Sequence, residues 1–246
     1  MLDYSLIIIA AFFAGVLNAI AGGGSFLTFP VLVYIGIPPI AANATSAVAV
    51  FPGYISSTLG FMREIKAFDR RQLIQLVFIA CLGGVSGALL LLLTPGNVFR
   101  IIAPWLLLAA TLLFALGDKI SVWLNKAQDD APRSHPLAVM LVSTYGGYFN
   151  GGLGIILLAL FSSMGFRDMN LMNGLKNGLS FILSAVSVLT FAIAGIVHWP
   201  QAAVMMMAAT LGGFGGARLA RRLPREWVKS IIVTIGSLMT LAFFVF

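Results

Sequence analysis

The sequence predicts an all-α polytopic membrane protein built from two inverted repeats. Each repeat is expected to hold a glycine-broken re-entrant helical hairpin followed by three transmembrane helices. Three observations predict this fold class: a composition too apolar for a soluble protein, internal similarity between the two halves of the chain, and an uneven placement of lysine and arginine between equivalent loops.

The composition excludes a soluble fold. Of the 246 residues, 60% are hydrophobic and only 9% are charged, whereas soluble domains carry roughly 25% charged residues. The mean hydropathy is +1.01. No stretch is long and polar enough to form a nucleotide-binding or catalytic domain, so we expect a protein embedded in the lipid bilayer and no enzyme activity. The net charge of +7 suits basic cytoplasmic loops and predicts no nucleic-acid partner.

The sequence holds no motif for a cofactor or a metal. The single cysteine, Cys81, allows neither an intramolecular disulfide nor a cysteine-based metal cluster. The phosphate-binding pattern GxxxxGK[ST] does not occur in the sequence. A cleaved signal peptide is not expected either, because such a peptide begins with basic residues and the only early charge here is Asp3.

The two halves of the chain resemble each other. Residues 82–88 (LGGVSGA) match residues 211–217 (LGGFGGA) at an offset of 129 positions, and Asn18 and Asn150 each precede a glycine cluster. Such duplication indicates one structural unit used twice. The predicted organisation is an N-terminal transmembrane repeat at 1–117, a polar linker at 118–136 and a C-terminal transmembrane repeat at 137–246.

Each half opens with a stretch that glycines interrupt. The pieces of these opening stretches are short for a full span but suit half-helices. Three apolar stretches follow in each half, each close to the roughly 20 residues that cross the hydrocarbon core. In chain order the expected elements are a broken hairpin at 5–36, spans at about 40–61, 72–93 and 99–117, a second broken hairpin at 137–165, and spans at about 171–196, 201–221 and 228–246.

Basic residues predict the orientation of these elements. The connection at 63–71 holds four basic residues, while its counterpart at 196–201 holds none; the segment 218–225 holds four arginines, while its counterpart at 94–97 holds none. By the positive-inside rule, equivalent loops then lie on opposite sides of the membrane, so the halves are inverted. Inversion requires that each broken hairpin enters and leaves on one side, which places both termini outside. The alternative is eight ordinary spans with parallel halves.

The two glycine breaks are the best sequence pointer to a binding site. Unwound backbone at membrane depth survives only inside protein or along a cavity. Asn18 and Asn150 precede the breaks and offer amide donors. A half-helix begins after each break, and its free N–H groups and positive dipole end favour an anion. The residues at these starts are Gly24 and Ser25 in the first half and Gly152 and Leu153 in the second. The alternative is that Gly and Asn only end one helix and start the next.

Lys176 is the basic residue expected several positions inside a span. A charge there costs at least about 2.5 kcal/mol unless hydration or a partner relieves it. No Asp or Glu lies within an expected span, so we expect the counter-ion to be an anionic substrate. The alternative is a lysine that extends to the cytoplasmic headgroups.

Polar residues around Lys176 and at the equivalent positions of the first half extend this site. Asn173 and Asn177 flank the lysine, and their counterparts include Asn43, Thr45 and Ser46. Amides, hydroxyls and one ammonium together suit an oxyanion. For Thr45 and Ser46, hydrogen bonding between helices is the alternative role.

Several short motifs occur together along the chain: AGGGSFLTFP at 21–30, GIPP at 36–39, NATS at 43–46, GYFNGGLG at 147–154 and NGLKN at 173–177. Over essentially the whole chain they resemble the TauE/SafE family of sulfite and organosulfonate exporters. The resemblance implies a multi-pass permease of the bacterial or archaeal cytoplasmic membrane that exports small sulfur-containing anions such as sulfite, sulfoacetate or related sulfonates. The second glycine motif is shorter than the first, so the two hairpin tips need not contribute equally.

The expected function is therefore export of a small anion by alternating access, without a cofactor. A negative cell interior favours anion export by about 2.3 kcal/mol per charge per 100 mV. The alternatives are a permease for a different small anion, an importer, a membrane enzyme and a non-transporting sensor subunit. Small-residue faces at Gly83, Gly87, Gly212 and Gly216 predict close helix packing and are compatible with a homodimer.

Overall fold

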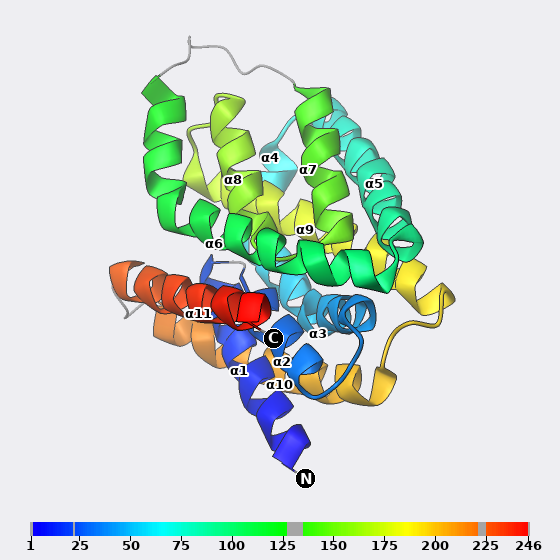
Figure 1. The fold of residues 1–246 in the computed structure, drawn as a ribbon. Helices are drawn as coiled ribbons and strands as arrows, with labels where there is room; N and C mark the ends of the chain where they lie inside the picture. Colours follow the sequence, from blue (N-terminus) through cyan, green and yellow to red (C-terminus); the bar gives the residue numbers. More distant parts are fainter. Residues whose placement is uncertain (1, 22, 127–134, 221–224, 246) are drawn as a thin grey trace.

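A computed structural model describes residues 2–21, 23–126, 135–220 and 225–245, and helices joined by short connections make up these ranges (Figure 1). The helices are, in chain order, α1 (Leu2–Ala21), α2 (Ser25–Tyr34), α3 (Pro39–Gly60), α4 (Met62–Ala67), α5 (Arg70–Leu93), α6 (Gly96–Lys126), α7 (Pro136–Tyr148), α8 (Leu153–Ser163), α9 (Met169–Ile193), α10 (Trp199–Ala220) and α11 (Arg225–Val245). The all-α class is therefore confirmed for the described ranges.

The order and the packing of the helices repeat between the two halves. A broken pair, α1–α2 or α7–α8, is followed by three long helices, and α4 is a short addition to the first half. The helix α1 packs against α10 as α7 packs against α5, and α5 packs against α9 as α10 packs against α3. Two further pairs join the halves, α3 with α9 and α6 with α11, and the latter two lie side by side across the front in Figure 1. The duplicated sequence thus has duplicated packing.

The helix bounds agree closely with the expected elements except at two ends. Within the described residues each of the six expected spans coincides with a long helix, and α9 ends at Ile193, before the expected end at 196. Among these residues three helices are long and apolar enough to cross a membrane: Arg70–Leu93, Gly96–Leu113 and Met169–Ile193. The helix α1 covers 20 residues, longer than the expected half-helix, because the polar residues at its start join it. The helix α6 continues past the expected end at 117, because residues 118–126 contain neither Gly nor Pro to stop it.

Side chains and glycines define the helix ends beside the connections. Asp69 and Asp168 accept backbone N–H bonds at the starts of α5 and α9, which is the usual role of Asp at an N-cap. Gly36, Gly165 and Gly195 follow α2, α8 and α9 with φ of 90°, 87° and 69°, a left-handed conformation that glycine adopts without steric cost. The two capping carboxylates are exposed and lie outside the helix interiors.

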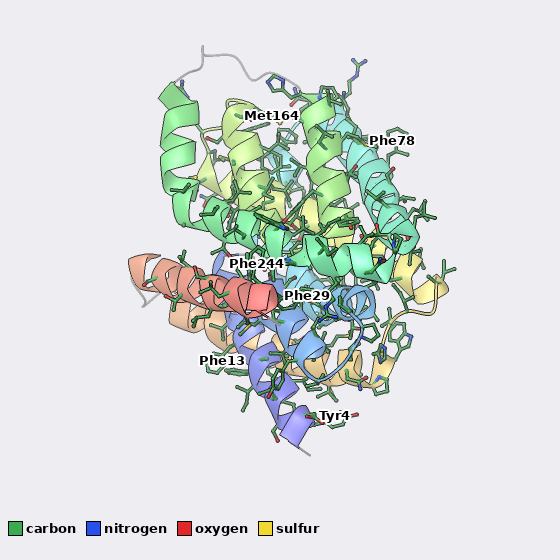
Figure 2. The ribbon with its side chains drawn as sticks, in the orientation of Figure 1. Tyr4, Phe13, Phe29, Phe78, Met164 and Phe244 are labelled. Atoms are coloured by element: carbon green, nitrogen blue, oxygen red, sulfur yellow. The ribbon has the colours of Figure 1, made fainter. Side chains whose placement is uncertain are left out.

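An aromatic cluster fills the region where the two halves meet. The buried ring of Phe29 lies 5.4 Å from that of Phe243, 5.7 Å from that of Phe149 and 6.3 Å from that of Phe99, measured between centroids. Figure 2 shows Phe29 at the centre of the molecule and Phe78 on the outer side of α5. Phe78 is 62% exposed, as expected for a face that contacts lipid.

Glycines allow α1 to approach α10 and α5 to approach α7 at backbone contact distance. A Cβ on Gly87 would collide with the carbonyl oxygen of Thr144 on α7, and a Cβ on Gly212 would collide with the carbonyl oxygen of Phe12 on α1. A Cβ on Gly83 would also collide with α7, at the Cβ of Ser143. The predicted small-residue packing is therefore confirmed for these three glycines, while the surroundings of Gly216 lie outside the described side chains.

We expect a Gly87→Ala substitution to destabilise the protein by about 1–3 kcal/mol, because the added methyl group must push α5 away from α7. Thermal unfolding of the purified protein in detergent measures the loss. Gly96→Ala is the matched control, since a Cβ at that position meets no atom within 4 Å. Equal unfolding temperatures for the two variants would contradict the close contact of these helices.

Candidate anion site

The break between α7 and α8 positions an asparagine in the interior. Gly152 has φ of +72°, and a Cβ on it would lie 2.9 Å from the Cβ of Ala110, so both the conformation and the space require glycine. The hydroxyl of Tyr145 donates to the carbonyl oxygen of Gly151 at 2.6 Å and holds the turn. Asn150, which precedes this turn, is consequently buried between α3 and α9.

Asn150 links these two helices through its side-chain amide. The Tyr54 hydroxyl on α3 donates to its Oδ1 at 3.4 Å, and its Nδ2 donates to Ser184 Oγ on α9 at 3.4 Å. Nearby, Asn43 Nδ2 on α3 donates to the carbonyl oxygen of Tyr148 at 2.9 Å. Two asparagines of the predicted site therefore hold the end of α7 against α3 and α9.

Asn43, Tyr54, Asn150 and Ser184 form a group that we call the Asn150 cluster. A small cavity of about 10 Å³ adjoins it, and this volume is room for roughly one water molecule. Neutral side chains and backbone line it, from Asn43, Ala47, Gly146, Gly147, Asn150, Ser184, Ser187 and Phe191. The Ser187 hydroxyl is buried and has no hydrogen-bond partner among the described residues. The cavity thus offers an unused hydroxyl but is closed to anything larger than water in this conformation.

A larger hollow lies elsewhere and shares no residue with this cluster. It measures about 210 Å³ and is formed by the starts of α5 and α7 and the end of α8, with Gln72, Gln75, His135 and Met164 among its lining residues. Figure 2 shows Met164 near the end of the molecule opposite Tyr4. The larger volume therefore lies between α5 of the first half and α7 and α8 of the second, away from the Asn150 cluster.

Lys176 lies on the same polar face of α9 as Ser184 of the Asn150 cluster and Ser187 of the small cavity. Residues 173, 176, 180, 184 and 187 follow one another at spacings of three or four, which places them along one side of a helix. They are Asn173, Lys176, Ser180, Ser184 and Ser187, and all but the half-buried Asn173 are buried. Lys176 and Ser184 are about 12 Å apart along the axis. This face leads from a buried cation to the Asn150 cluster.

The ammonium group of Lys176 has a neutral partner. The lysine is 7% exposed, and its Nζ donates to Asn173 Oδ1 at 3.3 Å. No carboxylate among the described residues forms an ion pair with it; Asp168 caps α9, and Glu64 is a half-buried residue of α4, which packs on α9. Every other Lys and Arg whose side chain the structure describes is exposed. The buried charge therefore lacks a protein counter-charge within the described part of the chain.

The equivalent face of α3 separates the predicted residues into two groups. Asn43, Ser46 and Tyr54 lie on one side of the helix, whereas Thr45 is about 200° around the axis from Asn43. Accordingly, the Thr45 hydroxyl accepts the backbone N–H of His198 at 3.1 Å and joins α3 to the start of α10. Ser46 Oγ lies 2.6 Å from Thr28 Oγ1 on α2. Both hydroxyls therefore make the contacts between helices that were their alternative role.

The first glycine break differs from the second. Gly24 precedes α2 in a right-handed conformation, and the buried Ser25 begins that helix. Asn18 is buried beside Gly24 and Gly53, and its Oδ1 has no hydrogen-bond partner among the described residues. The two glycine breaks thus differ in backbone conformation, while the unequal contribution of the two tips to a site, which the shorter second motif allowed, stays a prediction.

The structure brings some predicted residues together and reveals others. Asn43 and Asn150 share the small cavity, Asn173, Lys176 and the buried Asn177 lie near the start of α9, and Leu153 is buried at the start of α8. Sequence reasoning missed Tyr54, Ser184 and Ser187. The spacing of the serines behind Lys176, at plus four, eight and eleven, was the available signal for α9.

The chain is similar to known membrane proteins over nearly its whole length. The family model described as sulfite exporter TauE/SafE matches residues 7–243. A probable membrane transporter protein of Haemophilus influenzae is 28% identical over 96% of this chain and 92% of its own length. The probable membrane transporter protein YfcA of Escherichia coli is 30% identical over 94% of this chain and 85% of its own length. A further probable membrane transporter protein, from a Sinorhizobium species, is 29% identical over 94% of this chain and 88% of its own length. The chain therefore belongs to the TauE/SafE family and is a membrane transporter.

Proposed function

We propose that this transporter is a permease that exports small sulfur-containing anions, such as sulfite, sulfoacetate or related sulfonates, by alternating access. The observation that carries the proposal is the buried ammonium of Lys176, whose hydrogen bond goes to a neutral amide. An ammonium at such a place costs several kcal/mol unless an opposite charge compensates it. A transported anion supplies that charge during each cycle. The family description, sulfite exporter TauE/SafE, supports the sulfur-containing class.

The polar face of α9 supports a route for the anion. The anion first meets Lys176 and Asn173 and then the hydroxyls that lead toward the Asn150 cluster. Because the small cavity holds about one water molecule, passage of the anion requires that the helices around this cavity separate. The repeated packing of the two halves suits a movement of one half against the other, as in transporters with repeated halves.

The proposed membrane arrangement is that of two inverted halves in the cytoplasmic membrane, each beginning with a re-entrant hairpin. It rests on the charges of the loops and is supported by the exchange of packing partners between the halves. In this arrangement the loop at 63–71 and the loop at 218–225 face the cytoplasm. Lys176 then lies near the cytoplasmic end of α9, where an exported anion arrives.

Single cysteines at Gln128 and His198 should react with a membrane-impermeant thiol reagent from opposite sides of the membrane. The first position lies in the polar segment between the halves, and the second is exposed just before α10. The measurement uses a Cys81→Ser background, in intact cells and in inverted vesicles. Labelling of both positions from the same side would contradict the inverted arrangement.

We expect sulfite or a sulfonate to raise the unfolding temperature of the purified protein, because a ligand that binds only the folded state stabilises it. At a concentration of 100 times the dissociation constant the gain is about 2.7 kcal/mol. The panel comprises sulfite, short sulfonates, sulfate, phosphate and carboxylates at matched ionic strength. Stabilisation by carboxylates or phosphate alone would show that the protein carries a different anion, and no stabilisation by any of them would contradict an anion site.

A further inference from the structure

The described interior holds one charged side chain. Lys176 is buried, while every other described Lys or Arg, and the acids Asp3, Asp69 and Asp168, are exposed, and Glu64 is half-buried. The residues that line the small cavity beside the Asn150 cluster are neutral. Along the part of the proposed route that the described side chains form, an anion therefore meets a single positive charge and, beyond it, neutral groups.

A route with a single positive charge should favour anions with one negative charge over anions with two. The cost of transferring an ion from water into a poorly polarisable interior grows with the square of its charge, so a dianion costs roughly four times as much as a monoanion of the same size. One ammonium neutralises a monoanion fully and leaves a dianion with one uncompensated charge. Neutral dipoles then have to carry the difference at the Asn150 cluster, about 12 Å beyond Lys176 along α9.

The Asn150 cluster and the small cavity have donors for a single oxyanion. The Ser187 hydroxyl has no partner among the described residues, and the Tyr54 hydroxyl holds Asn150 through a long bond of 3.4 Å. Both hydroxyls can turn toward an oxyanion without breaking a short hydrogen bond. These two donors suit one sulfonate group but offer nothing to a second ionised group.

We infer that the transported species carries one net negative charge: a monoanionic sulfonate, or sulfite in its singly protonated form. The inference rests on the proposed function and narrows it, because doubly charged sulfoacetate and sulfate are then poor substrates. Short sulfonates without a second ionised group are the preferred class.

Three two-carbon sulfonates of similar size test this inference, since they differ mainly in net charge at neutral pH. They are 2-aminoethanesulfonate, with a net charge of zero, 2-hydroxyethanesulfonate, with one negative charge, and sulfoacetate, with two. Their dissociation constants come from thermal shifts of the full-length protein in detergent, and their uptake into inverted vesicles gives the transport rates. We expect 2-hydroxyethanesulfonate to bind at least about tenfold more tightly than sulfoacetate.

A second measurement changes the charge of the protein. Ser187 lies on the same face of α9 as Lys176 and lines the small cavity, so Ser187→Lys adds a second ammonium to the route. We expect this variant to lose the preference against sulfoacetate, while Ser187→Gln, which adds bulk without charge, keeps it. Size-exclusion chromatography identifies any variant that fails to fold, and in that case the comparison of the three sulfonates in the unchanged protein decides.

The outcomes separate the inference from the proposed function. Tighter binding of 2-hydroxyethanesulfonate than of sulfoacetate supports the inference. Equal or tighter binding of sulfoacetate overturns the selection by valence and leaves an anion permease standing. Binding of none of the three, together with no response to sulfite, overturns the proposed function and the inference with it.

Discussion

Glutamine in place of Lys176 will remove the stabilisation by sulfonates and sulfite and reduce their export to background. The substitution keeps a polar side chain of similar length but removes the one buried positive charge that the described residues hold. We expect the ligand-dependent shift of the unfolding temperature to vanish, a loss of about 2.7 kcal/mol at 100 times the dissociation constant of the unchanged protein. Lys176→Arg keeps the charge and should retain part of the binding.

The same variant should be more stable than the unchanged protein when no ligand is present. A buried charge without an opposite charge is costly, so its replacement by a neutral residue should raise the unfolding temperature of the unliganded protein. If the ammonium of Lys176 instead reaches the headgroups, it stays hydrated and does not destabilise the protein. The Lys176→Gln substitution would then leave the unfolding temperature unchanged. The unliganded protein thus distinguishes the two interpretations of Lys176 without any transport assay.

Lys66→Gln is the matched control for this experiment. It makes the same chemical change at an exposed position of α4, where one charge contributes little to stability. We expect anion-dependent stabilisation and export to be unchanged. If Lys176→Gln behaves like Lys66→Gln in both measurements, Lys176 is not part of the anion site.

The fold was largely predictable because apolar length and glycine breaks are local features of the sequence. Residues 40–61, 72–93 and 171–196 were expected as spans, and α3, α5 and α9 match them within three residues at each end. The longer α6 was missed because polarity was taken as the end of a helix, whereas a helix can continue beyond the membrane when no Gly or Pro interrupts it. Polarity marks the membrane boundary and not the helix end.

The site was predictable only in part because its members come from helices far apart in sequence. Lys176 was found because a charge inside a span is unusual. Tyr54 and Ser184 are ordinary residues for a membrane helix, and only the fold brings them to Asn150. Thr45, in contrast, is about 200° from Asn43 on α3, so its place on the other side of the helix could have been read from the spacing alone.

Asn150 and Asn18 are equivalent in the two halves but differ in their hydrogen bonds. Substitution of Asn150 is therefore the second change with a large expected effect. Leucine in place of Asn150 leaves the Tyr54 hydroxyl and Ser184 Oγ without their partner in the interior. Each buried polar group left unpaired costs about 1–3 kcal/mol, so we expect Asn150→Leu to destabilise the protein by roughly 2–6 kcal/mol in total. Chemical or thermal unfolding in detergent measures it.

Asn18→Leu makes the same change at the equivalent position of the first half and should cost far less. Asn18 Oδ1 has no hydrogen-bond partner among the described residues, so its removal relieves a buried acceptor instead of leaving one behind. We expect an unfolding temperature close to that of the unchanged protein. An equal loss of stability in Asn18→Leu and Asn150→Leu would contradict this difference. It would mean that the hydrogen bonds of Asn150 to α3 and α9 do not make the second hairpin tip more important for stability than the first. A large loss at Asn150 alone would instead make the second tip the one whose movement must break a hydrogen bond between the halves, because Tyr54 belongs to the first half and Asn150 to the second.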